Sequence, residues 1–285
     1  MKRFVLAADI GGTHITTAIV DLHEKKIFHE TWYRATVNSG GSAEEILQSW
    51  VEAMKESQNR FTSPVEMIKM ALPGPMDYKN GICLIQDQDK FQSMFAVQLK
   101  KELSQRLYFP QDQIEMFNDA ACFLKGELFG GTLEHHRRVI GLTLGTGLGS
   151  AAICKGKARD ADLWKMPFNG GIAEDYLSTR WFIGRFVELS NVRIRGVKDL
   201  TDYHMLSPYF SLIFSEFSFN LAKFICKFIK KAVPSAAVIG GNIALSSPYF
   251  LSQTHDYLKE MLGYEFPVYI ASQGEKATLL GAGAS

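Results

Sequence analysis

The first half of the chain alternates between strand-like and helix-like patterns of apolar residues. Residues 3–10 and 15–21 are rich in apolar and β-branched residues, and Gly11-Gly12 between them predicts the turn of a hairpin. A third strand is expected over 26–35. A helical pattern follows, which Ser42 can cap, and its apolar face is formed by Ile46, Leu47, Trp50, Val51 and Met54.

Short buried strands then alternate with amphipathic helices. We expect strands over 66–72 and 114–118, the first of them ended by Pro73-Gly74-Pro75, and helices over 96–108 and 120–129. The order of three strands, helix, strand, helix, strand and helix predicts a layered α/β domain.

The second half of the chain opens like the first. Residues 137–157 again give strand, glycine-rich turn and strand, about 130 residues after the first such unit, which indicates a duplicated domain. Phenylalanines at helical spacing over 207–233 predict a core helix. A further strand is expected to end at Gly240-Gly241, and residues 267–284 predict a strand, a turn and a closing helix.

Composition narrows the classes of function. The chain has 285 residues, of which 46% are hydrophobic, and a formal net charge of +1. A near-neutral chain is not typical of general nucleic-acid or membrane-surface binders. No apolar run reaches the ~20 residues that a membrane span needs, and Met1-Lys2-Arg3 runs into a strand with no signal peptide. We therefore expect a cytoplasmic protein that binds neither nucleic acid nor membrane.

The first hairpin carries polar residues where a plain hairpin needs none. Asp9 stands just before Gly11-Gly12, and Thr13 just after them. Glycines let backbone N–H groups face a ligand, and Thr13 adds a hydroxyl donor. Asp9 could hold Mg²⁺, usually through water, because Mg²⁺ prefers oxygen ligands and keeps much of its hydration. Taken alone, this segment fits a phosphate site and an ordinary hairpin equally well.

The second strand–turn–strand segment bears on the choice between these two interpretations. Gly145-Thr146-Gly147 again places small residues and a threonine between two strands. Two opposed hairpins could grip the phosphates of one nucleotide, which favours phosphate binding over two plain turns. The pattern is not the dinucleotide-binding fingerprint, because a strand follows the glycines where that motif needs a helix.

Asn118-Asp119 ends a strand midway between the two glycine turns. A carboxylate at a strand end that faces a cleft is suited to accept a hydroxyl proton, and in phosphoryl transfer such a base orients the attacking oxygen. The alternative is that this pair caps the next helix, with Asp119 at or near the N-cap. Both roles are compatible.

At this point the sequence resembles the ROK group of sugar kinases and regulators, within the actin-like, hexokinase-like ATPase superfamily. The resemblance rests on six segments in the family's order. They are ADIGGTHITTAIVD, ALPGPMD, FNDAACFLKGE, GLTLGTGLGSAAI, VIGGNIA and ATLLGAGA.

The resemblance implies an α/β, two-domain actin-like ATPase (ribonuclease H-like) fold with an interdomain cleft. The domains would be 1–118 and a larger 119–272, and a final helix at about 273–285 would pack back on the first. It implies ATP and Mg²⁺, and a hexose or N-acetylhexosamine hydroxyl as acceptor. Members of the family are commonly dimers, so a homodimer is expected.

The resemblance also assigns residues to these ligands. Asp119 would be the catalytic base, with Asn118 and Gly74 as sugar contacts. The nucleotide would be bound by the two turns and by the adenosine segment, that is, by Asp9, Gly11, Gly12, Thr13, Gly145, Thr146, Gly147, Gly240, Gly241 and Asn242.

One region departs from the family pattern. Residues 156–182 contain no His and no Cys, where most members have a sugar-contacting histidine and a cysteine-rich zinc loop, so we predict no zinc site. Glu174 aligns with a sugar carboxylate of the family, and Asp160, or else Asp162, could replace a missing glutamate. The alternative for these three residues is surface charge in a loop.

The segment 84–95 occupies the place of a sugar-reaching loop in the family. Asp89 and Lys90 are its candidates for a sugar contact, and an exposed linker is the alternative.

Three functions remain open at this stage. The first is an ATP-dependent sugar kinase, which both turns and Asp119 favour. The second is a sugar-responsive transcription regulator. Such regulators carry a DNA-binding helix-turn-helix before the first turn, whereas only eight residues precede Asp9. The third is a non-catalytic sugar- or nucleotide-binding protein that keeps the fold and has lost the chemistry.

Overall fold

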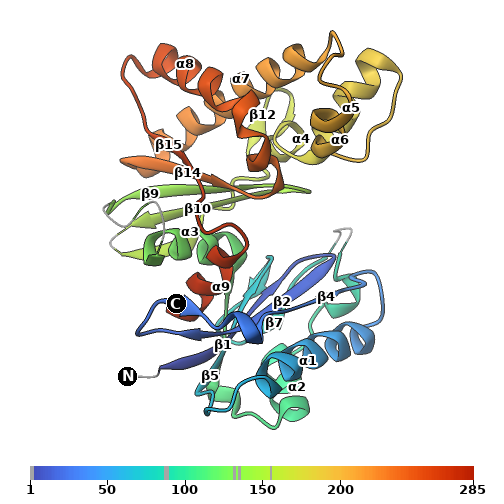
Figure 1. The fold of residues 1–285 in the computed structure, drawn as a ribbon, viewed down its shortest axis with the longest axis vertical. Helices are drawn as coiled ribbons and strands as arrows, with labels where there is room; N and C mark the ends of the chain where they lie inside the picture. The colour runs from blue at the N-terminus through green and yellow to red at the C-terminus, as the bar shows by residue number, and fades with distance from the viewer. Residues whose placement is uncertain (1–2, 87–89, 131–132, 134–135, 155) are drawn as a thin grey trace. The chain divides into compact units, whose positions relative to one another are not determined.

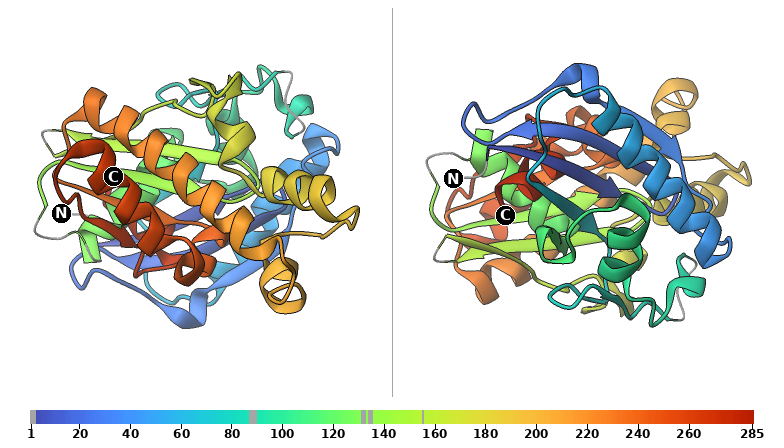
Figure 2. Two further views of the ribbon diagram at one scale, coloured as in Figure 1. Left: turned by 90° about the horizontal axis from the view of Figure 1, so that it is seen from above. Right: turned by 90° about the horizontal axis from the view of Figure 1, so that it is seen from below.

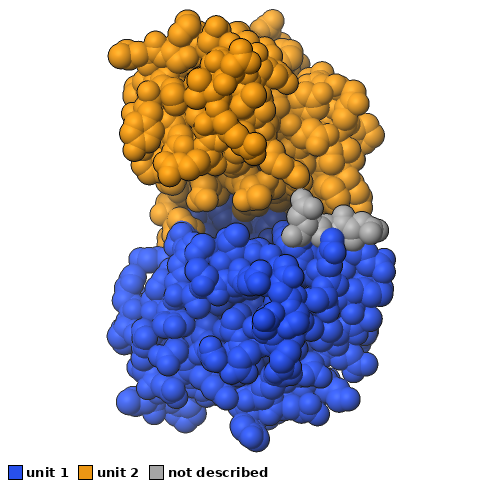
Figure 3. Space-filling model, turned by 90° about the vertical axis from the view of Figure 1, so that its right-hand side faces the viewer, with its two compact units in different colours: residues 1–131, 275–285 blue, residues 132–274 orange. Residues whose placement is uncertain are grey.

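The structure, a computed structural model, describes residues 3–86, 90–130, 133, 136–154 and 156–285. The chain forms two compact units, shown in different colours in Figure 3. Unit 1 comprises residues 1–131 and 275–285, and unit 2 comprises residues 132–274. Helix α3 (Asp119–Gly130) belongs to unit 1 because it packs against the C-terminal helix α9 (Lys276–Ala284). The predicted domain limits of 1–118 and 119–272 stay a prediction.

The sheet of unit 1 begins with the predicted hairpin (Figure 1). Its strands run in the order β3-β2-β1-β5-β8, and β4 also pairs with β2. Strands β1 and β2 are antiparallel, whereas β1, β5 and β8 are parallel. The bounds are β1 (Phe4–Ile10), β2 (His14–Asp21), β3 (Lys26–Ile27), β4 (Tyr33–Thr36), β5 (Met67–Leu72) and β8 (Ile114–Asn118), with a separate hairpin of β6 (Met76–Asp77) and β7 (Ile82–Cys83).

The single strand expected over 26–35 is wrong. The segment divides into β3, a 3-10 turn at His29–Thr31 and β4. The Thr31 hydroxyl donates to the Phe28 carbonyl at 2.6 Å and accepts the Ile19 N–H at 2.9 Å. This buried side chain replaces strand pairing at that point, since Thr side chains compete for backbone hydrogen bonds.

Helices cover both faces of this sheet because the apolar residues of β1 point alternately to either side. Leu6, Ala8 and Ile10 share a core with Trp50 of α1 (Ala43–Asn59), and α2 (Leu99–Leu107) packs into the same core. Val5 and Ala7 pack on the other side with residues of α9. The right-hand view of Figure 2 shows α1 in front of the strands. The cap of α1 is confirmed: Ser42 Oγ accepts the Glu45 N–H at 3.3 Å.

Glycines let α3 and α9 cross with their backbones in direct contact. A Cβ added at Gly126 would lie 1.8 Å from the Ala277 carbonyl oxygen, and one at Gly281 would lie 1.7 Å from the Cys122 carbonyl oxygen. Any side chain at either position would force the two helices apart. The C-terminal segment is thereby held on unit 1.

The sheet of unit 2 repeats the plan of unit 1. Its order is β11-β10-β9-β14-β15, with an antiparallel β9–β10 hairpin and parallel β9, β14 and β15. The predicted duplication is therefore confirmed at the level of strand order. The bounds are β9 (Val139–Leu144), β10 (Leu148–Cys154), β11 (Lys157–Asp160), β14 (Ala236–Gly240) and β15 (Val268–Ile270), with a small hairpin of β12 (Pro167–Phe168) and β13 (Gly171–Ile172).

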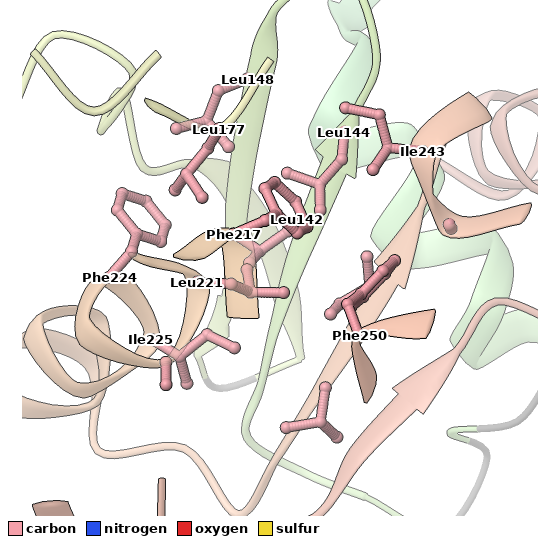
Figure 4. Close-up of a cluster of buried hydrophobic side chains, with 14 of the residues drawn as sticks. Leu142, Leu144, Leu148, Leu177, Phe217, Leu221, Phe224, Ile225, Ile243 and Phe250 are labelled. Carbon is pink, nitrogen blue, oxygen red and sulfur yellow. The ribbon is translucent and has the colours of Figure 1, made fainter. Parts of the chain in front are cut away.

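Aromatic side chains build most of the core of unit 2. The predicted phenylalanine-rich helix is α7 (Phe210–Ala232), which lies over β9 and β10 in the left-hand view of Figure 2. Phe217, Phe224 and Phe250 pack with leucines of the sheet in Figure 4. The remaining helices are α4 (Ala173–Tyr176), α5 (Thr179–Ser190), α6 (Val197–Tyr203) and α8 (Leu251–Leu262).

Within the described part of the chain, no helix combines the length and apolar character that crossing a membrane requires.

Candidate active site

Three predicted site segments of unit 1 meet at one edge of its sheet. Asp9 pairs with Ala71 in the parallel β1–β5 register, and Leu72 pairs with Asn118 in the β5–β8 register. Because the carboxyl ends of parallel strands meet at the same sheet edge, this edge holds Asp9 near the end of β1, Gly74 after β5 and Asp119 after β8. Ligands of open α/β sheets bind outside this edge.

The first turn leaves polar groups at the surface. The Gly11 N–H donates to the His14 carbonyl at 2.9 Å, and the Thr13 carbonyl accepts the Val37 N–H at 2.8 Å. Gly11 and Thr13 are exposed. A Cβ added at Gly12 would lie 3.3 Å from Cδ of Lys90, so this turn passes directly beneath the lysine stem.

Two carboxyl groups beside this turn have raised pKa values. Burial, followed by the charges of Asp119 and Glu275, raises the pKa of Asp9 to about 7. Burial also raises the pKa of Asp119, while the Lys90 charge and the Ala120 N–H, which is 2.8 Å from Oδ1, lower it. A carboxylate with a raised pKa is the kind of group that accepts a proton near neutral pH.

The donor set around Asp9 fits a hydrated magnesium ion. The charge of Asp119 raises the pKa of Asp9, and a divalent cation would offset this repulsion. Among the described residues, no three or more His, Cys, Asp or Glu side chains are grouped to enclose a metal ion. Mg²⁺ commonly uses one or two carboxylates and keeps several waters, which such an open arrangement allows.

Asn118 joins the ends of two strands to the start of α3. Its Oδ1 accepts the Ala121 N–H at 3.0 Å, and its Nδ2 donates to the Tyr78 hydroxyl at 3.3 Å. The Tyr78 hydroxyl in turn donates to the Leu72 carbonyl at 3.1 Å. A Cβ added at Gly74 would lie 3.3 Å from the same Tyr78 hydroxyl oxygen. The helix-capping contact expected near Asp119 is therefore made by the Asn118 side chain. Asp89 lies outside the described residues.

Unit 2 brings its own predicted residues to the matching sheet edge. Thr143 pairs with Gly240 in the parallel β9–β14 register, so the second turn and Gly241-Asn242 both follow carboxyl strand ends. Gly241 has φ +86°, and a Cβ there would lie 2.4 Å from the Leu144 carbonyl oxygen. Only glycine adopts this positive φ readily and has no Cβ that would meet the Leu144 carbonyl oxygen.

The carbonyl of Gly145 accepts two hydrogen bonds from the start of α5. The Thr179 N–H donates at 2.8 Å and the Thr179 hydroxyl at 2.9 Å. Apart from Gly145 and its two neighbours in the chain, none of the described residues has an atom within 4 Å of a Cβ added at Gly145, so this side of the turn is open among them.

Glu174 contacts the second turn directly. Its Oε2 accepts the Leu148 N–H at 2.9 Å, and its Oε1 is 2.7 Å from Arg180. A Cβ added at Gly147 would lie only 2.6 Å from the same Oε2. The structure thus brings Glu174 to the glycine turn, at the place where the turn enters β10.

Asp160 lies at the end of the strand β11, opposite Ala151 of β10. Its Oδ1 accepts the Asp162 N–H at 2.8 Å, and Asp162 forms an ion pair with Lys165 at 2.6 Å. These contacts are those of a turn at a strand end. The assignment of Asp160 to sugar binding stays a prediction.

A groove of about 690 Å³ lies elsewhere on unit 2. It is lined by side chains of α4, α5, α7 and α8, among them Tyr176, Trp181, Arg185, Glu216 and Tyr257. The predicted site residues do not line it, so volume alone does not locate the chemistry of this chain.

Sequence reasoning missed three residues that shape the candidate site. Tyr78 links the strand ends of unit 1, and Thr179 and Arg180 hold the second turn and Glu174. The only local signal in the sequence was the pair Ser178-Thr179, which is typical of the start of a helix. No pattern in the sequence indicated Tyr78, because its partners are brought together by strand pairing.

Three comparisons agree on the relationships of this chain. Residues 5–161 match the family model described as "ROK family". The chain is 27% identical over 155 residues to a glucokinase of Thermotoga maritima, covering 54% of this chain and 46% of that protein. It is 26% identical over 152 residues to an N-acetyl-D-glucosamine kinase of Pectobacterium carotovorum, covering 53% and 46%. The chain thus spans about half the length of the curated relatives it matches.

Similarity to solved structures extends over almost the whole chain. A ROK family glucokinase from Streptomyces griseus, solved with glucose and AMPPNP, superposes with a TM-score of 0.79. The sequence identity is 23%, and the match covers 98% of this chain and 97% of that one. The chain has the α/β fold of the ROK sugar kinases, that is, the actin-like ATPase fold.

Proposed function

The chain belongs to the ROK family, and on that premise we propose that it is an ATP-dependent sugar kinase. It transfers the γ-phosphoryl group of ATP to a hydroxyl of a hexose or an N-acetylhexosamine. The observation that carries the proposal is the Asp119 carboxyl, whose pKa is raised by burial. Asp119 follows β8, which β5 separates from β1, the strand that carries Asp9 and leads to the first glycine turn.

Asp119 acts as the general base. Its Oδ1 accepts the Ala120 N–H, which helps to fix the carboxylate that accepts the proton of the acceptor hydroxyl. The hydroxyl oxygen that loses this proton attacks the γ-phosphorus, while the bond between the γ-phosphorus and the ADP oxygen breaks. Because the pKa of Asp119 is raised, kcat/KM falls on the acid side at a higher pH than an ordinary aspartate would give.

Backbone donors and a hydroxyl bind the nucleotide. In unit 1, Gly11, Gly12 and Thr13 offer N–H groups and a hydroxyl to phosphate oxygens. In unit 2, Gly145, Thr146 and Gly147 do the same, and Gly240, Gly241 and Asn242 lie against the adenosine. Mg²⁺, held by Asp9 through water, would offset charge on the phosphates.

The sugar is bound by side chains around Asp119 and by Glu174. Asn118 and Gly74 adjoin the base in unit 1, and Glu174 and Asp160 contribute from unit 2. The named relatives include a glucokinase and an N-acetyl-D-glucosamine kinase, which supports these two classes of acceptor.

Coupled ADP release with Mg-ATP, measured across hexoses and N-acetylhexosamines, tests the proposal. We expect turnover with one class of sugar, and a loss of about 10²–10⁴-fold in kcat for Asp119→Asn. The exposed Asp112, on the same unit, provides the control Asp112→Asn, which should keep wild-type turnover. Full activity in Asp119→Asn would show that the base is misassigned. Nucleotide binding with no turnover on any sugar would favour the non-catalytic alternative.

A further inference from the structure

We propose that Lys90 is a further substrate-binding residue of unit 1, whose ammonium group binds the phosphoryl group that is transferred. This assignment rests on the proposed function. It adds a cation to a site whose other groups in unit 1 are carboxylates, backbone amides and a hydroxyl.

The backbone at Lys90 is fixed next to the first turn. The following residue, Phe91, is 1% exposed and packs edge-on against Trp50, with ring centroids 5.7 Å apart. The Phe91 N–H donates to the Ser39 carbonyl at 2.8 Å, and Ser39 Oγ would lie 3.8 Å from a Cβ at Gly12. Lys90 therefore emerges from a buried attachment point beside the glycine turn.

Phe91 also has an unusual conformation. It lies in the left-handed region, with φ 58° and ψ 22°. A bulky residue is rarely found there, and such backbone strain is concentrated at functional sites. This conformation turns the chain at the position that presents Lys90.

The stem of Lys90 lies along the turn. Its Cδ would be 3.3 Å and its Cβ 3.8 Å from a Cβ at Gly12. Glycine at position 12 thus makes room for the lysine as well as exposing backbone amides. The stem therefore lies over the segment that we assign to phosphate binding.

The charge of Lys90 acts on the catalytic carboxyl. It is the largest favourable electrostatic influence on ionised Asp119, opposing the effect of burial. A phosphoryl group in transfer carries negative charge on three equatorial oxygens, and the nearby carboxylates would repel it. A cation whose stem lies over the turn and whose charge acts on the base offsets that repulsion where the charge develops.

The proposed step balances without a change in Lys90. The acceptor hydroxyl loses its proton to Asp119, its oxygen forms a bond to the γ-phosphorus, and the bond from phosphorus to the ADP oxygen breaks. Lys90 takes no part in the bond changes, and its ammonium group donates hydrogen bonds to the γ-phosphoryl oxygens.

The variant Lys90→Met removes the charge and keeps a stem of similar length over Gly12. We expect kcat to fall about 10²-fold with little change in the KM for sugar. Lys90→Arg, which restores a cation, should recover most of kcat. Lys100→Met is the matched control, because the Lys100 stem also covers a glycine, with Cγ 2.4 Å from a Cβ at Gly81, and this variant should keep wild-type kcat.

Calorimetry gives a second measurement that does not depend on turnover. In Lys90→Met the affinity for Mg-AMPPNP should fall about 10-fold, whereas the affinity for Mg-ADP, which lacks the γ-phosphoryl group, should not change. Equal losses for both nucleotides, or none for either, would overturn the assignment of Lys90.

The two proposals can fail separately. A wild-type protein that transfers phosphate while Lys90→Met behaves like Lys100→Met would refute the role of Lys90 and leave the kinase intact. If the wild type binds nucleotide but transfers no phosphate, the AMPPNP-to-ADP affinity ratio decides about Lys90 alone. A wild type that binds no nucleotide and transfers no phosphate would refute both.

Discussion

The two glycine turns occupy equivalent places in two sheets of the same strand order, yet their surroundings differ in charge. The turn of unit 1 lies beneath the stem of Lys90, and two carboxyl groups of the same unit, those of Asp9 and Asp119, have raised pKa values. The turn of unit 2 is held by the carboxylate of Glu174 through the Leu148 N–H. A duplicated backbone thus carries two carboxyl groups with raised pKa values in one unit, and in the other a glycine turn braced by a carboxylate.

The units also differ in how their sheets are covered. In unit 1, α3 and α9 touch through glycines, so main chain meets main chain. In unit 2, α7 covers the sheet with phenylalanine rings (Figure 4). Backbone contact tolerates no added atom, whereas an aromatic core can adjust by small changes of side-chain rotamer. The two units therefore have different sensitivity to the same kind of substitution.

The largest effect is expected from a methyl group at the glycine contact. Gly281→Ala should lower the free energy of unfolding by about 3 kcal/mol, because its Cβ would meet the Cys122 carbonyl at 1.7 Å. In α5 of unit 2, a Cβ added at Gly184 would meet no atom of the described residues within 4 Å beyond its own helix backbone, so Gly184→Ala should stabilise by about 0.5–1 kcal/mol. Differential scanning calorimetry measures both. An unchanged Tm in Gly281→Ala would mean that the two helices are not in contact.

The next effect concerns the raised pKa of Asp9, which distinguishes unit 1 from unit 2. The folded pKa of about 7 lies above the ordinary value of 3.8, so the folded state favours the protonated form. The stability contributed by Asp9 is present in full below about pH 4 and is lost as the pH rises through 7.

Asp9→Asn removes this dependence, because its side chain stays neutral. Without metal, we expect the Tm of Asp9→Asn to exceed that of the wild type, and the difference should grow between pH 4 and 7. At its largest, it should correspond to on the order of a few kcal/mol in the free energy of unfolding. Added Mg²⁺ should stabilise the wild type and narrow the difference. Parallel Tm curves across this pH range would show that Asp9 is not destabilised by burial.

The smallest effect separates two roles of Glu174. Glu174→Gln keeps an acceptor for the Leu148 N–H, so nucleotide affinity should stay near that of the wild type. It removes the charge proposed to bind sugar, so the sugar KM should rise about 10-fold, as for the loss of one charged hydrogen bond.

Glu174→Ala removes both the acceptor and the charge. We expect it to weaken nucleotide binding as well as sugar binding, as measured by calorimetry and by initial rates. A Glu174→Gln variant with the wild-type sugar KM would limit Glu174 to bracing the second turn.

The order of elements was largely predictable because its signals are local. The hairpin of unit 1, the Ser42 cap and the phenylalanine-rich helix follow from periodicity and capping chemistry within short windows. The strand expected over 26–35 failed because the Thr31 side chain bonds to Ile19 and Phe28 and interrupts it. Its β-branched and aromatic composition gave no indication of that interruption.

The candidate site was predictable only in part. Glycine turns and acidic residues at strand ends can be recognised in the sequence, because turns and strand ends have characteristic residues. The contacts of Asn118 with Tyr78 and of Glu174 with Leu148 join positions that are far apart in the chain. Such partners depend on strand register, which no local pattern determines.

The sequence by itself determined the kinds of groups available to this protein: two glycine turns after apolar strands, with Asp9 before the first turn and Asp119 at a strand end. Only the tertiary structure decided how these groups behave. Burial raised the pKa values of Asp9 and Asp119, and the fold set Lys90 over Gly12 and Glu174 against the second turn. The physical reason is that desolvation and Coulomb interactions depend on neighbours in space, whereas residue type and spacing depend only on neighbours along the chain.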